Sequence, residues 1–133
     1  MKAFRDRVEA GDFAGLGDLL ADDVVFRSPV AFKPYEGKPI VAAILRGVSR
    51  VFEDFRYVNE VADGDSSVLV FQTRVGETSV HGADFLHVNA VGLVDELTVM
   101  VRPLSAAHAL ADAMGAQFDR IQTEAAAALT GDQ

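Results

Sequence analysis

The sequence predicts an α+β domain in which helices cover one face of a curved antiparallel sheet. Three observations predict this class: apolar residues recur at helical spacing over 2–21 and 39–53, they alternate with a period of two over 55–102, and helical spacing returns from residue 105. Helices that flank a run of antiparallel strands pack on one face of the sheet. A strongly bent sheet covered in this way is a cone with an apolar interior.

The first 53 residues are expected to form three helices and one strand. Apolar residues recur every three or four positions in two short segments and in a longer one, whose first residue, Pro39, suits the first turn of a helix. A β-branched and aromatic run that stops at Ser28-Pro29 predicts the strand. We therefore expect helices over 2–10, 12–21 and 39–53, a strand over 24–26 and a loop over 30–38.

The second half of the chain is expected to form an antiparallel meander and a final helix. Turn residues separate four alternating runs, which predict strands over 55–62, 67–75, 79–89 and 93–102. Pro103 closes the last strand, and Ser105 suits the cap of a helix. The apolar residues of this helix are Leu110, Met114, Phe118 and Ile121.

The length of 133 residues fits a single domain that holds a core without disulfide or metal staples. We expect one domain over 1–133, of which 1–122 is folded. The tail over 123–133 is rich in alanine and then polar, so we expect it to fray.

Composition excludes several classes of partner and cofactor. Twenty acidic against twelve basic residues give a formal charge of −8, which repels nucleic acid and anionic membranes at long range. The longest apolar runs are far shorter than the roughly 20 residues that cross a bilayer, and the charged N-terminus lacks the apolar stretch of a secretory signal. The chain has no cysteine and no glycine-rich phosphate loop. We expect a cytoplasmic protein with no cofactor, no nucleic-acid partner and no membrane partner.

Several short motifs occur in a characteristic order along residues 3–118. They are Ala10-Gly11-Asp12, the run from Leu19 to Val24, Tyr35-Glu36-Gly37 before a helix, and Gly82-x-Asp84 followed by Val88-Asn89 and Gly92. Together they resemble the nuclear transport factor 2-like superfamily, and within it the SnoaL-like, polyketide-cyclase-like members. The resemblance implies the cone-shaped, cystatin-like fold, frequent homodimers, and a pocket between the sheet and the long helix.

The superfamily includes ketosteroid isomerase, whose pattern requires a tyrosine on the first helix, an aspartate base after the first strand and a protonated aspartic acid on the penultimate strand. The matching positions of this sequence hold Phe4, Ser28 and Asp84. Serine lacks the proton affinity of a base, so we do not expect steroid isomerisation by that mechanism. The patterns of limonene-epoxide-hydrolase-like and scytalone-dehydratase-like members are not matched either.

Asp84 is the candidate catalytic residue. Strand alternation places it on the same face as Val80, Leu86 and Val88, which are apolar. Burial there disfavours the ionised carboxylate and raises its pKa, which is how an aspartic acid remains a neutral hydrogen-bond donor. The alternative is a structural role, in which Asp84 accepts hydrogen bonds from a neighbouring strand or turn.

Two further polar residues are candidate ligand-binding groups. Ser28 lies at the expected mouth of the cone, where its hydroxyl suits a ligand carbonyl or hydroxyl group, and its alternative role is a strand-terminating turn. Tyr57 is expected to donate a hydrogen bond into the pocket, or else to lie at the rim as an amphipathic aromatic. The aromatic residues expected in the apolar wall include Phe4, Phe26 and Phe52.

His81 is the last candidate ligand-binding residue. Its odd parity relative to Asp84 points it to the opposite face of the strand, unless a bulge at Gly82 turns it toward the pocket. The alternative is a sheet surface that forms a dimer interface. His81 and His87 share one face, but no carboxylate follows at a matching spacing, so we expect no metal site.

These observations favour a small protein with an apolar pocket and leave two functions open. The first is an isomerase, cyclase or hydratase acting on a hydrophobic carbonyl or hydroxyl metabolite, with Asp84 as acid or base. The second is a non-catalytic ligand-binding or dimerisation module, which Phe4 and Ser28 favour. We also expect a homodimer, because a strand face beyond the helix-covered side carries residues such as Val58, Leu69 and Phe71.

Overall fold

The computed structural model describes residues 1–130 and confirms the predicted α+β class. Two short helices precede the first strand, a third helix lies between the second and third strands, and a long helix follows the last strand. The elements in chain order are α1 (Lys2–Glu9), the 3-10 helix η1 (Gly15–Leu19), β1 (Leu20–Arg27), β2 (Tyr35–Glu36), α2 (Lys38–Val51), β3 (Glu53–Asp63), β4 (Ser66–Val75), β5 (Thr78–Val88), β6 (Val94–Arg102) and α3 (Leu104–Thr130). Among these described residues, no helix is both long and apolar enough to span a membrane.

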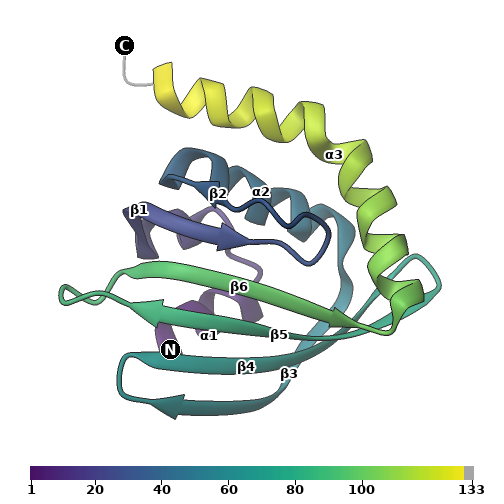
Figure 1. Ribbon diagram of the computed structural model, residues 1–133, viewed down its shortest axis with the longest axis horizontal. Helices are drawn as coiled ribbons and strands as arrows, with labels where there is room; N and C mark the ends of the chain where they lie inside the picture. The colour runs from purple at the N-terminus through teal and green to yellow at the C-terminus, as the bar shows by residue number, and fades with distance from the viewer. Residues whose placement is uncertain (131–133) are drawn as a thin grey trace.

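One curved sheet contains all six strands, in the order β2-β1-β6-β5-β4-β3. The strands β3 to β6 form the predicted antiparallel meander, whereas β1 runs parallel to β6. Figure 1 shows α1 and α2 on one side of the sheet, and α3 rising from the end of β6 before it crosses beside α2. The helices therefore close the concave side of the sheet, and its other face is left uncovered by them.

Three predicted elements differ from the structure. The segment predicted as a helix over 12–21 is a single 3-10 turn, and β1 begins at Leu20, because Gly15 and Gly17 weaken the helix. The predicted loop over 30–38 contains β2, which pairs with β1. The tail expected to fray from residue 123 is helical through Thr130, as its high alanine content favours; residues 131–133 lie outside the described part.

Close packing and ion pairs hold α3 against α2. A Cβ atom added at Gly47 of α2 would lie 2.7 Å from Cδ1 of Ile121, so the two helices meet where α2 lacks a side chain. Arg46 and Arg50 of α2 both bind the carboxylate of Glu124, at 2.9 and 3.0 Å. These contacts fix the second half of α3 relative to the sheet.

The inner face of the sheet is set by strand alternation, which also corrects one expectation. Leu69 and Phe71 were expected on the exposed face, but they pair with Asp84 and Gly82 and share their inner, buried face. A Cβ atom at Gly82 would overlap the Phe71 ring and lie 2.7 Å from the Met100 carbonyl oxygen, so only glycine fits there. The glycine thus lets the Phe71 ring lie close to the backbone of β5.

Candidate functional site

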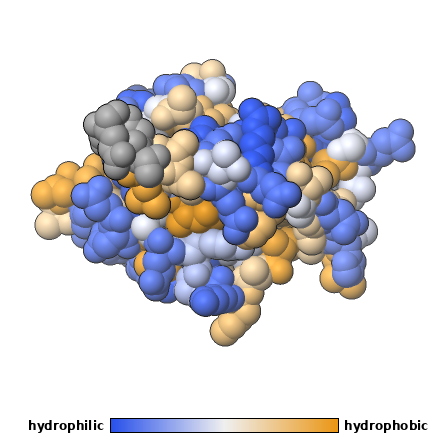
Figure 2. All heavy atoms as spheres, turned by 90° about the horizontal axis from the view of Figure 1, so that it is seen from above, coloured by the Kyte–Doolittle hydropathy of each residue, from blue (hydrophilic) through white to orange (hydrophobic). Residues whose placement is uncertain are grey.

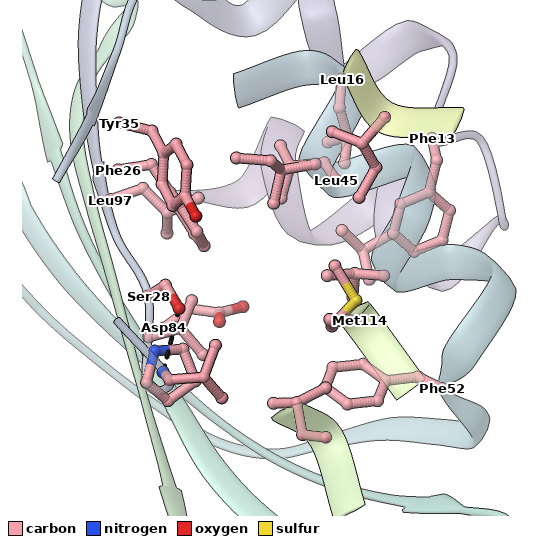
Figure 3. Close-up of a pocket in the computed structure, with 18 of the residues that line it drawn as sticks. Phe13, Leu16, Phe26, Ser28, Tyr35, Leu45, Phe52, Asp84, Leu97 and Met114 are labelled. Atoms are coloured by element: carbon pink, nitrogen blue, oxygen red, sulfur yellow. Dashed lines mark hydrogen bonds between the residues drawn. The ribbon is translucent and has the colours of Figure 1, made fainter. Parts of the chain in front are cut away.

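The sheet and the helices enclose a cavity of about 300 Å³, shown in part in Figure 3. Of the 24 residues that line it, only four have a polar side chain: Ser28, Tyr35, Tyr57 and Asp84. Apolar cavities with a few polar groups are typical of sites for small molecules. The chemistry of this cavity therefore depends on those four side chains.

Asp84 reaches the cavity from the inner face of β5. Asp84 is only 9% exposed, and Figure 3 shows its carboxyl group directed from the sheet toward the middle of the cavity. The hydroxyl of Tyr57 donates a hydrogen bond of 2.9 Å to Oδ2. Within residues 1–130, no side chain or backbone group bonds to Oδ1. One carboxyl oxygen is therefore held by the protein, and the other is available to a ligand.

Burial controls the ionisation of this pair. Loss of water raises the pKa of Asp84 to about 7, and the hydrogen bond from Tyr57, which favours the carboxylate, opposes part of that rise. Burial also raises the pKa of Tyr57, and the neighbouring Asp84 charge raises it further. Tyr57 therefore stays a neutral donor near pH 7, while Asp84 is present in both protonation states.

Aromatic packing holds Tyr57 in place on β3. Its ring meets Phe55 edge to face at a centroid distance of 4.9 Å, and Phe55 stacks on Phe71 at 5.0 Å. The guanidinium of Arg5, on α1, lies 5.6 Å from the Tyr57 ring centroid, within the range of a cation–π contact. The phenol is thus fixed by strands and by the first helix before it meets Asp84.

Ser28 follows the last residue of β1 and lies on the same wall as Asp84 (Figure 3). Its Oγ accepts a hydrogen bond of 3.0 Å from the backbone N–H of Val30. This bond is the turn expected from Ser-Pro, and it leaves the hydroxyl proton of Ser28 free to donate. The residue is therefore both a turn former and a hydrogen-bond donor at the cavity wall.

The other predicted ligand-binding residues divide into two groups. Phe4, Phe26 and Phe52 all line the cavity. His81 does not: the pairing of β4 with β5 runs without a bulge at Gly82, so His81 stays on the outer face. There its Nδ1 lies 3.4 Å from Nη1 of Arg102.

Sequence reasoning missed one wall of the cavity. Six lining residues belong to α3: Leu110, Ala111, Met114, Gly115, Phe118 and Ile121. Four of them show helical spacing in the sequence, which indicates an apolar helix face but not what that face covers. The helical spacing therefore identified the apolar residues of α3 but did not show that they line the cavity.

One group of side chains in residues 1–130 has ligand atoms close enough for a metal ion, which the sequence spacing did not reveal. His87, Asp95 and Glu96 place one ligand atom each within 4.8 Å of one another. However, His87 Nδ1 bonds Asp95 Oδ1 at 2.6 Å, and Arg27 binds Glu96 at 3.2 Å. The hydrogen bond to Asp95 raises the pKa of His87. The contacts of His87 with Asp95 and of Arg27 with Glu96 therefore explain, without a metal ion, why these side chains lie together.

The fold and this geometry can be compared with known proteins. The chain is similar to the structure of a steroid delta-isomerase from Pseudomonas aeruginosa, with 41% sequence identity and a TM-score of 0.86; the match covers 92% of this chain and 90% of that chain. It is also similar to the structure of an uncharacterised cystatin-like protein from Silicibacter pomeroyi, with 36% sequence identity and a TM-score of 0.84; this match covers 90% of this chain and 87% of that chain. An epoxide hydrolase/cyclase-like enzyme of pyran ring formation shares the fold at 14% identity, with coverage of 79% and 88% and a TM-score of 0.64.

No curated protein matches the sequence. The model of the SnoaL-like domain matches residues 1–97, which include β1 to β5, the position of Asp84 and both short N-terminal helices. The chain therefore belongs to the family of SnoaL-like domains within the nuclear transport factor 2-like superfamily.

Proposed function

We propose that the cavity binds a small, largely apolar molecule that carries a carbonyl or hydroxyl group, and that Asp84 exchanges a proton with it. One observation carries this proposal: a buried carboxyl group whose Oδ2 is held by Tyr57 and whose Oδ1 faces an apolar cavity. A carboxyl group with a pKa of about 7 is matched to proton transfer near neutral pH. The ligand is expected to be largely apolar because twenty of the 24 lining residues have no polar side chain.

The bond from Tyr57 directs the proton of the neutral acid. Because Tyr57 donates to Oδ2, the proton of protonated Asp84 lies on Oδ1, toward the cavity. In this state Asp84 donates to a ligand oxygen. In the ionised state the same Oδ1 accepts a proton from the ligand, and the Ser28 hydroxyl is the neighbouring donor for a ligand oxygen.

An isomerase is the reaction class that this arrangement favours. Ionised Asp84 takes a proton from a carbon next to a carbonyl group, the negative charge moves to the carbonyl oxygen beside Ser28, and protonated Asp84 returns the proton to another carbon. The step moves one double bond and changes no atom count. The 41% identity to a steroid delta-isomerase supports this class, although Phe4 and Ser28 stand where the three-group steroid mechanism has its tyrosine and its base.

The second candidate function is ligand binding without catalysis. Its supporting observation is that, among the lining residues, Asp84 is the sole carboxyl group and no second base faces it. In this case the Asp84 and Ser28 groups fix the orientation of a ligand oxygen, and the proton stays where it is.

A β,γ-unsaturated steroid ketone and cyclohex-3-enone are suitable probes of the two functions. We expect the protein to convert at least one of them to the conjugated enone, which absorbs in the ultraviolet, and to incorporate deuterium from D2O next to the carbonyl group. Asp84→Asn lowers the rates of both by about 10²- to 10⁴-fold, and Asp23→Asn, an exposed matched control on β1, leaves both unchanged. If either ketone binds but neither reacts nor exchanges, the non-catalytic function is correct.

The macromolecular partner that we propose is a second copy of the chain, bound through the outer face of the sheet. Neighbouring positions there are apolar: Val68 pairs with Phe85, and Ala83 pairs with Met100. Phe85 is 38% and Met100 57% exposed. A symmetric dimer buries this patch against itself.

The two ends of the same face carry opposite charge, which suits a two-fold axis. At one end Arg56, Gln72, His81 and Arg102 form one row across four strands. At the other end Asp63, Ser66, His87 and Glu96 form a second row. A two-fold axis that passes through the apolar centre and runs across the strands places the arginine row of one copy over the acidic row of the other.

Light scattering tests this association. We expect the mass of two chains at micromolar concentration, and the mass of one chain for Met100→Asp, because the charge is then buried at the centre of the interface. Glu77→Lys, in the exposed turn that joins β4 to β5, is the control and stays dimeric. A parent protein with the mass of one chain refutes the proposed dimer.

A further inference from the structure

The exposed residues of the lining locate an opening of the cavity to solvent. Three of its lining residues are exposed, namely Val30, Gly115 and Phe118; the other lining residues are buried or half-buried. Val30 lies in the segment between β1 and β2, whereas Gly115 and Phe118 lie one helical turn apart on α3. Seen from the side of α3, hydrophobic side chains reach the surface among hydrophilic ones (Figure 2). The mouth therefore lies between α3 and the segment over 28–34.

Gly115 differs from the other glycine at the helix interface. A Cβ atom at Gly47 would collide with Ile121, so packing requires glycine there. A Cβ atom at Gly115 would meet no atom within 4 Å. Glycine in a helix interior costs about 1 kcal/mol relative to alanine. Packing gives no reason for glycine at position 115, whereas the open space beside it belongs to the mouth.

We infer that Gly115 is the entrance residue of the cavity: its missing side chain keeps open a passage between α3 and the segment over 28–34, and so sets the width of the molecules that reach Asp84. A side chain at this position would extend into the mouth beside Val30 and Phe118. The position lies beyond residue 97, where the match to the family model ends, so α3 supplies this side of the entrance from outside the matched part. The inference deepens the proposed function, because it concerns access to the same cavity.

The absence of cysteine allows a direct test that needs no ligand. Leu45 is 6% exposed, lines the cavity and points into it from α2 (Figure 3). Leu45→Cys therefore places a single thiol inside. Its rate of alkylation under native conditions is measured with iodoacetamide, which is small, and with N-(1-pyrenyl)maleimide, which is wide. The ratio of the wide-reagent rate to the small-reagent rate reports the width of the entrance.

We expect Gly115→Leu, added to Leu45→Cys, to lower this ratio at least tenfold. Phe118→Ala, which removes a side chain from the same rim, raises the ratio. The matched control is Ala116→Leu, which adds the same side chain at the next, exposed position of α3 that does not line the cavity, and leaves the ratio unchanged. If Leu45→Cys destabilises the protein, Val48→Cys, also in the wall of α2, takes its place.

Three outcomes overturn the inference. They are a ratio unaffected by Gly115→Leu, an equal decrease in Ala116→Leu, and a cavity thiol that reacts with neither reagent while the protein is folded. Reaction through global unfolding is recognised by its dependence on low concentrations of urea. Failure of the proposed function leaves the thiol result intact, since the alkylation rate depends on access alone; conversely, ketone turnover that depends on Asp84 does not require the entrance to be at Gly115.

Discussion

The two walls of the cavity differ in chemistry and in rigidity. On the sheet side, Asp84 on β5 and Tyr57 on β3 come from strands that both pair with β4, and Ser28 directly follows β1. On the side of α3, the lining residues are apolar, and two of them are exposed. Groups that must be placed accurately lie on the part that backbone pairing fixes, whereas the helix determines size and access. The chemistry and the selection of the ligand therefore depend on separate parts of the chain.

The largest effect is expected from removing the carboxyl group of Asp84, which tests whether the sheet wall supplies the chemistry of the cavity. Asp84→Asn keeps the size of the side chain and removes its proton transfer, so any isomerisation or deuterium exchange should fall by about 10²- to 10⁴-fold. Thermal melts should show that the fold persists. Turnover retained in Asp84→Asn would show that the sheet wall does not supply the chemistry.

The same acid makes stability depend on pH. Folding raises the pKa of Asp84 from 3.8 to about 7, so the folded state holds the proton more tightly than the unfolded state, and its contribution to stability is lost as pH rises between those values. The difference in unfolding free energy between the parent and Asp84→Asn should fall by up to about 4 kcal/mol from pH 4 to 7.5, at 1.36 kcal/mol per pKa unit. Urea titrations at several pH values measure it, and a difference that does not change with pH contradicts the raised pKa.

Glycine substitutions compare the two walls directly. On the sheet wall, Gly82→Ala places a methyl group against the Phe71 ring and the Met100 carbonyl oxygen, and should cost about 1–3 kcal/mol of stability. On the helix wall, Gly115→Ala meets open space and should stabilise the protein by about 0.5–1 kcal/mol. Urea unfolding of both variants tests the comparison. Destabilisation by Gly115→Ala would mean that the α3 wall is packed as tightly as the sheet.

A further prediction concerns the hydrogen bond within the sheet wall. Tyr57→Phe removes the donor to Oδ2, so the carboxylate loses a favourable partner and the pKa of Asp84 should rise above about 7. Above that pH the variant should lose about 1–2 kcal/mol of stability. Carboxyl-carbon NMR titration follows the pKa. A lower pKa in the variant would mean that Tyr57 does not stabilise the ionised form.

The sequence predicted the fold and the inner-facing acid because both depend on local periodicity. Alternation places Asp84 with Val80 and Leu86 without knowledge of any other strand, and the structure keeps all three buried. The partner of Asp84 could not be predicted in this way. Tyr57 lies two strands away on β3, and the register of β3 with β4 shifts just after Tyr57, so the meeting of the two side chains depends on pairing and not on spacing.

The α3 wall could not be predicted for a related reason. Helical spacing identifies the apolar residues of α3, but their target is set by the direction in which the helix leaves β6 and by its anchor on α2. The 3-10 turn was missed because Leu16 and Leu20 fit a helical period although two nearby glycines weaken the helix. Periodicity therefore did not predict two properties: the direction in which a helix packs, and the effect of glycine on backbone conformation.

The ion pairs of Glu124 make the packing of α3 on α2 depend on the salt concentration. The carboxylate of Glu124 binds the guanidinium groups of Arg46, Arg50 and Arg120, all within 3.1 Å, and these ion pairs are partly exposed to water. Dissolved salt weakens such pairs over a Debye length of about 10 Å at 0.1 M ionic strength. The anchor of α3 on α2 should therefore loosen as ionic strength rises, and amide hydrogen exchange in the second half of α3 should accelerate, while exchange in β5, held by backbone pairing, stays constant.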